Sequence, residues 1–287
     1  MTRAYQRSWQ ITLGQTRIES ADPGRNELAV KFEITKSTKR EPNTATVRVA
    51  NILRAKRREF EEMDEPQIEI IAGYKDYRDT IFVGDARDIW SEKEGADIWT
   101  TFEAEDGGRS YRTAEIEQSF GESVPVITVL RACTDAMGVG LGNAQQVIAS
   151  AELDTAGDNF AGGVVLSGQA WRQLDRICRS CSLRWSIQNG VLQLRQSGRP
   201  SETTAIRLSP DTGLIGSPTR GAKDERTGKV SHAVKAMLIP GLYPGRVVQV
   251  ASSELEGDFM IRRVSYVGDS SGPDWYADLE CEEYDAA

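Results

Sequence analysis

Histidine is almost absent from this chain, since His232 is the single one among 287 residues. A serine or cysteine nucleophile therefore has no histidine base except His232, which lies in a polar stretch, and no Gly-x-Ser-x-Gly elbow is present. No Gly-x-Gly-x-x-Gly opens a helix after a strand. The sequence predicts a protein that is not an enzyme. Because Asp and Glu are numerous, a hydrolase with a dispersed carboxylate pair stays open as an alternative.

Cysteine is also scarce, and its four residues are Cys133, Cys178, Cys181 and Cys281. Cys178 and Cys181 have the spacing of a metal site, but zinc needs four ligands and no second pair is present. Both residues fall on the apolar stripe of a predicted helix. This position favours small buried hydrophobic side chains over a metal or redox pair. We expect neither a metal nor another cofactor.

Long apolar runs and strongly basic segments are missing as well. No stretch approaches the roughly 18 apolar residues that span a bilayer, and the first residues contain no apolar core of a secretory signal. We therefore expect that the protein is made in a cytoplasm and does not insert into a membrane. The net charge of −8 is spread along the chain, which argues against a sequence-specific nucleic-acid partner. The one dense basic cluster, residues 54–58, is interpreted as a solvated helix face.

Two β-rich blocks enclose a block of mixed character. Residues 1–107 contain short runs in which apolar and polar residues alternate, as strands with one buried face do. Residues 108–202 contain two amphipathic helical patterns followed by a hairpin pattern. Residues 203–287 return to short strands separated by turn residues. We predict three domains with these boundaries.

Local signals place helix starts and one turn. Asn51, Ser123 and Ser167 are predicted N-caps, because their side-chain oxygens can accept from the first free amides of a helix. Gly138 is the predicted end of the second helix. The hairpin of the middle block has Asn189–Gly190 at its turn, the pair typical of type I′ geometry.

The last block carries an ordered set of turn and strand residues. They are Pro240, Pro244, Gly245, Gly257, Phe259, Ile261, Val264, Tyr266, Gly268, Asp269 and Trp275. In this order and spacing the block resembles the C-terminal signature of phage tail baseplate hub proteins. This contractile-tail family is related to late control protein D and to the hub part of type VI secretion spike proteins. Residues 212–220 look like the family's lead-in and residues 165–198 like its middle domain, while Ile239 departs from the pattern.

The resemblance implies a mainly β fold with an α+β insert, in which two tail-tube-like antiparallel β-barrel modules flank a small α+β domain. It implies a structural virion protein, a baseplate hub in the phage tail that assembles in the host cytoplasm. As a homotrimer, the hub would present six modules to the six-fold tail tube and three copies to the three-fold central spike, and would let DNA pass. The implied partners are other copies of the chain and the tail tube, central spike, tape measure and baseplate wedge proteins.

Two polar loops are the expected contact sites with neighbouring rings or with the spike. The first lies in residues 35–43 and the second in residues 221–230. Edge strands of the two modules are expected to pair around the ring. The candidate interface residues are Lys39, Arg40, Glu41, Pro42, Lys223, Asp224, Glu225, Arg226 and Lys229.

Aromatic residues near charged turns support a second interpretation. Trp90 and Trp99 flank the charged turn at 91–97, and Tyr74 and Tyr77 lie in another turn. Core packing accounts for such residues, but exposed rings can also anchor an interface. On a β scaffold, Trp90, Trp99 and Tyr74 are the side chains that would stack on sugars. A cell-wall carbohydrate-binding module is therefore the alternative function.

Overall fold

The computed structural model describes residues 6–20, 28–150, 159–223 and 228–284. They form two compact units, each of which is described by itself. The sheet unit is drawn from residues 1–37, 43–105 and 202–283, and the helical unit from residues 38–42, 106–201 and 284–287. Within the described ranges, no helix is long and apolar enough to span a membrane.

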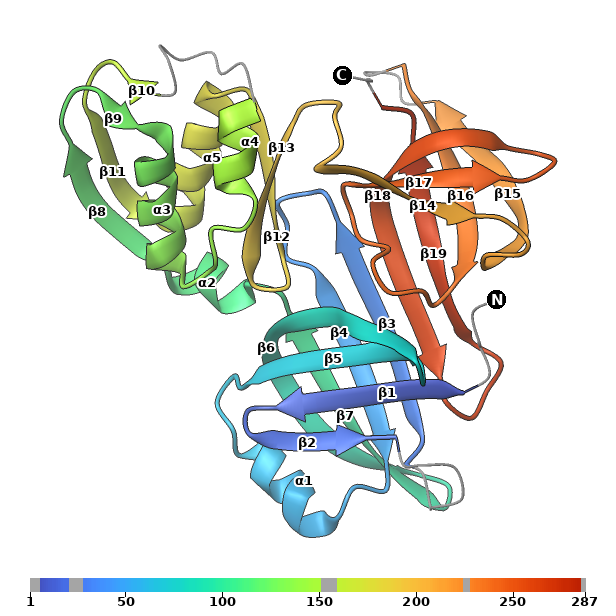
Figure 1. Ribbon diagram of the computed structural model, residues 1–287. Coiled ribbons are helices and arrows are strands. Elements are labelled where there is room, and N and C mark those ends of the chain that lie inside the picture. Colours follow the sequence, from blue (N-terminus) through green and yellow to red (C-terminus); the bar gives the residue numbers. More distant parts are fainter. Residues whose placement is uncertain (1–5, 21–27, 151–158, 224–227, 285–287) are drawn as a thin grey trace. The chain divides into compact units, whose positions relative to one another are not determined.

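The described residues of the sheet unit form thirteen strands in one sheet and one helix, α1 (Arg54–Glu61) (Figure 1). The path of paired strands is β15-β16-β19-β18-β3-β4-β7-β6-β5-β1-β2, and β17 carries β14 at one side of β18. The strands are β1 Arg7–Leu13, β2 Thr16–Glu19, β3 Val30–Ser37, β4 Thr44–Ala50, β5 Gln67–Tyr74, β6 Tyr77–Glu94, β7 Asp97–Glu105, β14 Glu202–Leu208, β15 Leu214–Lys223, β16 Val230–Met237, β17 Arg246–Ala251, β18 Glu256–Asp269 and β19 Trp275–Glu282.

The pairing of β3 with β18 joins the two β-rich blocks. Residues 31–37 lie antiparallel to residues 263–269, and the other edge of β3 pairs with β4. A barrel closed within the first block would need a strand of that block on the edge of β3 that β18 occupies. In the described part of the chain this path ends at β2 and β15 without closing, and the branch through β17 ends at β14. The mainly β prediction is confirmed, whereas the structure has one open sheet where two barrels are predicted.

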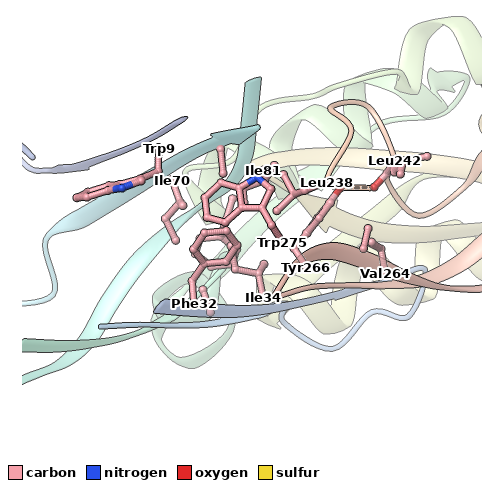
Figure 2. Close-up of a cluster of buried hydrophobic side chains, with 14 of the residues drawn as sticks. Trp9, Phe32, Ile34, Ile70, Ile81, Leu238, Leu242, Val264, Tyr266 and Trp275 are labelled. Carbon is pink, nitrogen blue, oxygen red and sulfur yellow. Dashed lines mark hydrogen bonds between the residues drawn. The ribbon is translucent and has the colours of Figure 1, made fainter. Parts of the chain in front are cut away.

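Aromatic packing at the β3–β18–β19 junction fills the core of the sheet unit (Figure 2). The rings of Phe32 and Trp275 meet edge to face with centroids 5.3 Å apart. The Trp275 indole Nε1 donates to the Gly73 carbonyl oxygen at 3.0 Å, and the buried Tyr266 hydroxyl donates to the Leu242 carbonyl. These contacts join the C-terminal strands to β5 and to the loop before β17.

Gly268 makes the close packing of β18 on β3 possible. It lies opposite Phe32 in the register of the two strands. A Cβ atom at position 268 would lie 2.2 Å from the Phe32 Cζ atom, so the ring occupies the space of any side chain there. Gly268, one of the residues of the C-terminal signature, is therefore required by the close approach of the Phe32 ring.

The helical unit packs helices against two-stranded ribbons. Helices α3 and α5 contact each other and enclose a separate apolar core. The elements are α2 Gly108–Thr113, β8 Glu115–Phe120, β9 Val124–Pro125, α3 Val126–Met137, α4 Ala144–Ser150, β10 Asn159–Phe160, β11 Val164–Gln169, α5 Ala170–Ser180, β12 Leu183–Gln188 and β13 Val191–Gln196. Strand β8 pairs with β11, β9 with β10, and β12 with β13.

The predicted hairpin of this unit is confirmed. Asn189 and Gly190 both have positive φ angles, 55° and 75°, as a type I′ turn requires, and they connect β12 to β13. The buried Asp106 carboxylate accepts from both turn amides, at 2.7 Å from Asn189 N and 2.9 Å from Gly190 N. A charged acceptor at two adjacent amides fixes the turn.

All four cysteines are buried, and none forms a disulfide. Burial of Cys178 and Cys181 is what the apolar stripe of their helix predicts. Burial raises the pKa of the Cys133 thiol to about 12, and it raises the pKa values of Cys178 and Cys281 as well. A thiol is protonated below its pKa, and only the thiolate attacks disulfide reagents.

Native protein at pH 8 is therefore expected to react with Ellman's reagent at fewer than one thiol per chain, while unfolded protein reacts at all four. Absorbance at equal chain concentration with and without denaturant measures both values. Rapid reaction of Cys178 or Cys181 in the native protein, located by mass spectrometry, would contradict the structural role of the pair.

Candidate interaction surface

The first predicted contact loop lies within the helical unit. Residues 38–42 belong to this unit, where the Arg40 guanidinium contacts the Asp175 carboxylate of α5 at 2.7 Å and the Tyr111 hydroxyl donates to the Arg40 carbonyl. Lys39 and Glu41 have exposed side chains, and Pro42 is half-buried. Arg40 therefore holds the loop in place, while the side chains of Lys39 and Glu41 beside it are exposed.

Asp175 is the polar centre of this part of the unit. Besides Arg40, it contacts Arg179 at 2.9 Å and accepts from the Trp185 indole Nε1 at 3.2 Å. The Tyr111 ring stacks on Trp185 with centroids 5.8 Å apart. Burial raises the pKa of Tyr111, and the nearby Asp106 and Asp175 carboxylates contribute to the increase, so the tyrosine is neutral and can donate.

Replacement of Asp175 by alanine is expected to lower the free energy of unfolding of the helical unit by about 1–2 kcal/mol. The loss is moderate because both arginine partners are about half exposed, with side-chain accessibilities of 47 % and 57 %. Urea titration followed by circular dichroism measures the change. Arg172→Ala, on an exposed position of the same helix, is the matched control and should change the value by less than about 0.5 kcal/mol.

The second predicted contact loop connects β15 to β16. Lys223 ends β15 with an exposed side chain, and Lys229 is half-buried just before β16. Asp224, Glu225 and Arg226 lie outside the described residues. The structure therefore places only the two ends of this loop.

The aromatic residues of the carbohydrate alternative are not gathered on the surface. Tyr74 and Trp99 are buried, with exposed fractions of 6 % and 8 %, while Trp90 and Tyr77 are exposed at 38 % and 44 %. The guanidinium of Arg48 lies 5.2 Å from the Trp99 ring centroid. Two of the three rings proposed to stack on sugars are thus committed to packing.

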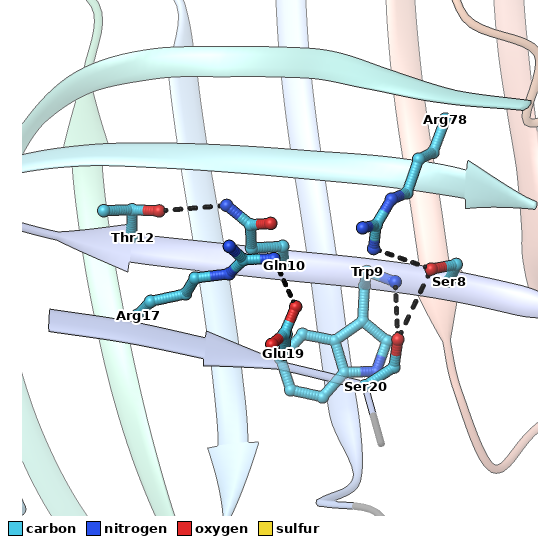
Figure 3. A network of polar contacts seen from close by, with 8 residues as sticks. All are labelled: Ser8, Trp9, Gln10, Thr12, Arg17, Glu19, Ser20 and Arg78. Carbon is cyan, nitrogen blue, oxygen red and sulfur yellow. Dashed lines mark hydrogen bonds and ion pairs between the residues drawn. The ribbon is translucent and has the colours of Figure 1, made fainter. Parts of the chain in front are cut away.

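The two ends of the sheet carry features that discourage further strand pairing. At β2, Arg17 and Glu19 form an ion pair at 2.5 Å on the edge strand, and a polar network covers the neighbouring face of β1 (Figure 3). At β15, Pro218 has no amide hydrogen, and the register with β16 shifts between Ile215 and Thr219. Edge charges, proline and bulges interrupt a regular ladder.

His232, the single histidine of the chain, lies in the core. The His232 ring is buried and packs on Phe259 with ring centroids 4.8 Å apart. Within the described ranges, no three His, Cys, Asp or Glu side chains are placed to hold a metal ion.

Comparison with known proteins gives the fold a context. No protein-family profile and no curated protein sequence matches the chain. Among solved structures, it is similar to the 43 kDa tail protein of prophage MuSo2 from Shewanella oneidensis, with a TM-score of 0.64, 10 % identity and 97 % of each chain covered. The fold is that of phage tail proteins. A tail protein from Neisseria meningitidis gives a TM-score of 0.63 at 10 % identity, again over 97 % of each chain.

The tail-protein fold extends to a secretion machine. A component of the type VI secretion system of E. coli, described as structurally similar to tail proteins of bacteriophage T4, gives a TM-score of 0.54 at 10 % identity. The match covers 96 % of this chain and 77 % of that one. Phage tail and type VI secretion proteins are the two groups to which the C-terminal signature points, so the recognised resemblance is confirmed at the level of the fold.

Proposed function

We propose that this chain is a baseplate hub of a phage tail, a structural protein without catalytic activity. The observation that carries the proposal is the tail-protein fold over nearly the whole chain, with two β-rich blocks in one sheet and a helical unit inserted between them. Its three domains are residues 1–107, 108–202 and 203–287, the first and last being tube-like modules.

The hub acts as a homotrimeric adaptor. Three copies with two modules each present six modules to the tail tube, while the same ring offers three equivalent positions to the central spike. The spread negative charge keeps DNA from adhering as it passes through the ring. Tape measure and baseplate wedge proteins are the remaining partners, and the site of action is the virion.

Contacts in the ring use exposed and half-buried residues of the two loops described above. Lys39, Glu41 and Pro42 form one contact site, and Lys223 and Lys229 with the residues between them form the other. Because Pro218 and the bulges interrupt β15, neighbouring copies meet through side chains of the edge strands and not through a long backbone ladder.

Light scattering on purified protein is expected to give three times the 31.7 kDa mass of one chain, and end-on images by negative-stain electron microscopy should show a ring with six similar lobes. Lys223→Glu is expected to keep the trimer mass and to lose co-elution with tail tube or spike protein. A monomer across micromolar concentrations would overturn the hub proposal. A Lys223→Glu protein that loses the trimer would instead overturn the loop assignment.

The carbohydrate-binding alternative is less well supported because Tyr74 and Trp99 are buried. A sedimentation assay with purified peptidoglycan distinguishes the two proposals. The hub stays in the supernatant, whereas a cell-wall module sediments with the polymer.

A further inference from the structure

The ribbon of β8 and β11 in the helical unit has one closed edge and one open edge. Side chains of α5 cover the edge of β11 that faces away from β8. Arg176 Nη2 donates to the Val165 carbonyl at 2.5 Å, and Gln173 Nε2 donates to the Ser167 carbonyl at 2.6 Å. In Figure 1, β8 lies at the outer side of the ribbon. Two carbonyl groups of β11 that point away from β8 therefore have hydrogen-bond donors within the unit, whereas the corresponding edge of β8 is open.

The register identifies the open backbone groups of β8. Val165 lies opposite Ser119, and Ser167 lies opposite Glu117. In an antiparallel pair, directly opposed residues either bond to each other or both point outward. Because the carbonyls of Val165 and Ser167 point outward, so do the backbone groups of Glu117 and Ser119. In the part of the chain that the structure describes, neither residue has a backbone partner on its outer side.

An apolar groove runs beside this open edge, between β8 and α3, with a volume of about 410 Å³. Its apolar lining comes from Ile116 and Phe120 of β8 and from Ala132 and Ala136 of α3, while Arg131 and Asp135 are exposed polar residues of the same groove. A groove between an edge strand and a helix is the arrangement in which domains bind an extended peptide as an added strand. The small alanine side chains leave room for apolar residues of modest size.

The outer face of β8 is acidic. Glu115 and Glu117 have exposed side chains on this face, and the exposed Glu122 follows the strand. Opposite charges directly across a strand pair stabilise it, and like charges oppose it. Residues of an added strand that lie opposite Glu115 and Glu117 are therefore favoured as Lys or Arg.

We propose that the open edge of β8 binds an extended segment of another protein in which Lys or Arg alternates with small apolar residues. The apolar side chains enter the groove beside Ile116 and Phe120, and the basic side chains face Glu115 and Glu117. Backbone hydrogen bonds to Glu117 and Ser119 hold the segment in register. The site lies within a single helical unit, so it does not depend on the trimer.

Protection of the edge against aggregation explains the glutamates alone, since charges on edge strands serve that purpose. It does not explain why the edge next to an apolar groove is the one left open while β11 is closed by two side chains of α5. The combination of open backbone, apolar groove and acidic outer face specifies a binding partner.

The test uses the full chain and a fluorescein-labelled probe peptide, Lys-Val-Lys-Ala-Lys-Val-Lys, in a fluorescence anisotropy titration. The matched probe Glu-Val-Glu-Ala-Glu-Val-Glu has the same apolar residues and the opposite charge. Glu117→Pro removes the outward amide without removing a bond to β11, and Glu117→Ala keeps that amide. Glu115→Lys/Glu117→Lys reverses the charge of the outer face.

The basic probe is expected to bind the unaltered protein saturably. The acidic probe is expected to bind it with an affinity lower by roughly ten-fold or more, and the Glu117→Pro and double lysine variants are expected to bind the basic probe with a similar loss. Glu117→Ala is expected to lose only about two- to three-fold. Nuclear magnetic resonance shifts should fall on β8 and on the α3 face of the groove, and thermal unfolding should show each variant folded.

Absence of saturable binding of the basic probe overturns the proposal, as does equal binding by folded Glu117→Pro protein. If Glu117→Pro changes the mass measured by light scattering, the edge is a contact between copies of this chain, and the basic-segment proposal is wrong. The trimer mass of the unaltered protein tests the hub proposal separately.

Discussion

Trp275→Ala is expected to lower the free energy of unfolding of the sheet unit by about 3–5 kcal/mol, the usual effect of removing a large buried aromatic side chain. Trp275 is 4 % exposed and packs edge to face on Phe32. Its Nε1 atom also donates to Gly73, a residue 202 positions away in the chain. The substitution thus removes buried area, an aromatic pair and a hydrogen bond between distant strands.

Two variants separate these contributions in urea titrations followed by circular dichroism. Trp275→Phe keeps much of the ring and loses the hydrogen bond, so its expected loss is about 1–2 kcal/mol. Tyr276→Ala removes the adjacent half-buried ring, whose centroid lies 3.6 Å from Lys235 Nζ. Its expected loss is under about 1 kcal/mol. Equal stability of Trp275→Ala and the unaltered protein would show that the junction is not the core of the unit.

Asp106→Ala is expected to have the second largest effect, a loss of about 3 kcal/mol in the helical unit. Asp106 is fully buried and accepts hydrogen bonds from the amides of Asn189 and Gly190. In the alanine variant both amides lose this charged acceptor. Hydrogen bonds to charged groups contribute more than neutral ones, and a partly buried amide without a partner is costly.

Hydrogen exchange of the β12–β13 hairpin amides, followed by mass spectrometry, is the direct measurement. Faster exchange in Asp106→Ala should be confined to the helical unit, because Asp106 contacts the turn of that unit. Asp106→Asn keeps one acceptor oxygen and should lose less. Glu122→Ala, at an exposed turn of the same unit, is the control and should exchange like the unaltered protein. Unchanged exchange in Asp106→Ala would refute the role of the carboxylate.

Local patterns predicted elements well where one face of a strand is buried or a turn needs special residues. Alternation in β1 and β3 and the Asn189–Gly190 turn are clear examples. The predicted helix caps are wrong. Helices α1, α3 and α5 have Leu53, Pro125 and Gln169 at their N-caps, and none of these makes a side-chain cap.

Asn51 shows why one cap was predicted wrongly. It has a positive φ of 58°, which asparagine tolerates, and its side chain accepts from Ile98 N at 3.0 Å and donates to Asp97 at 2.8 Å. Asn51 therefore serves to adopt a positive φ angle and to contact β7, and it does not cap the helix. Sequence alone does not distinguish these uses of a short polar side chain.

The candidate interaction surface was less predictable because it depends on contacts between distant residues. Arg40 and Asp175 lie 135 positions apart, and a charged loop gives no indication that one of its residues is held by an ion pair. Trp99 begins four consecutive buried residues of β7, so alternation does not reveal that its ring is buried. The open edge of β8 follows from the register with β11 and the reach of α5, which no local pattern specifies.

The pairing of β3 with β18 sets an order of events during synthesis. Thr35 and Ser265, whose hydroxyl oxygens lie 3.3 Å apart, are separated by 230 positions, which takes on the order of tens of seconds to translate. Throughout that interval the nascent first block lacks the strand that covers β3. A prematurely terminated polypeptide keeps this uncovered edge, so it is prone to aggregate and to be degraded. Pairing with β18 therefore removes this exposed edge of the first block.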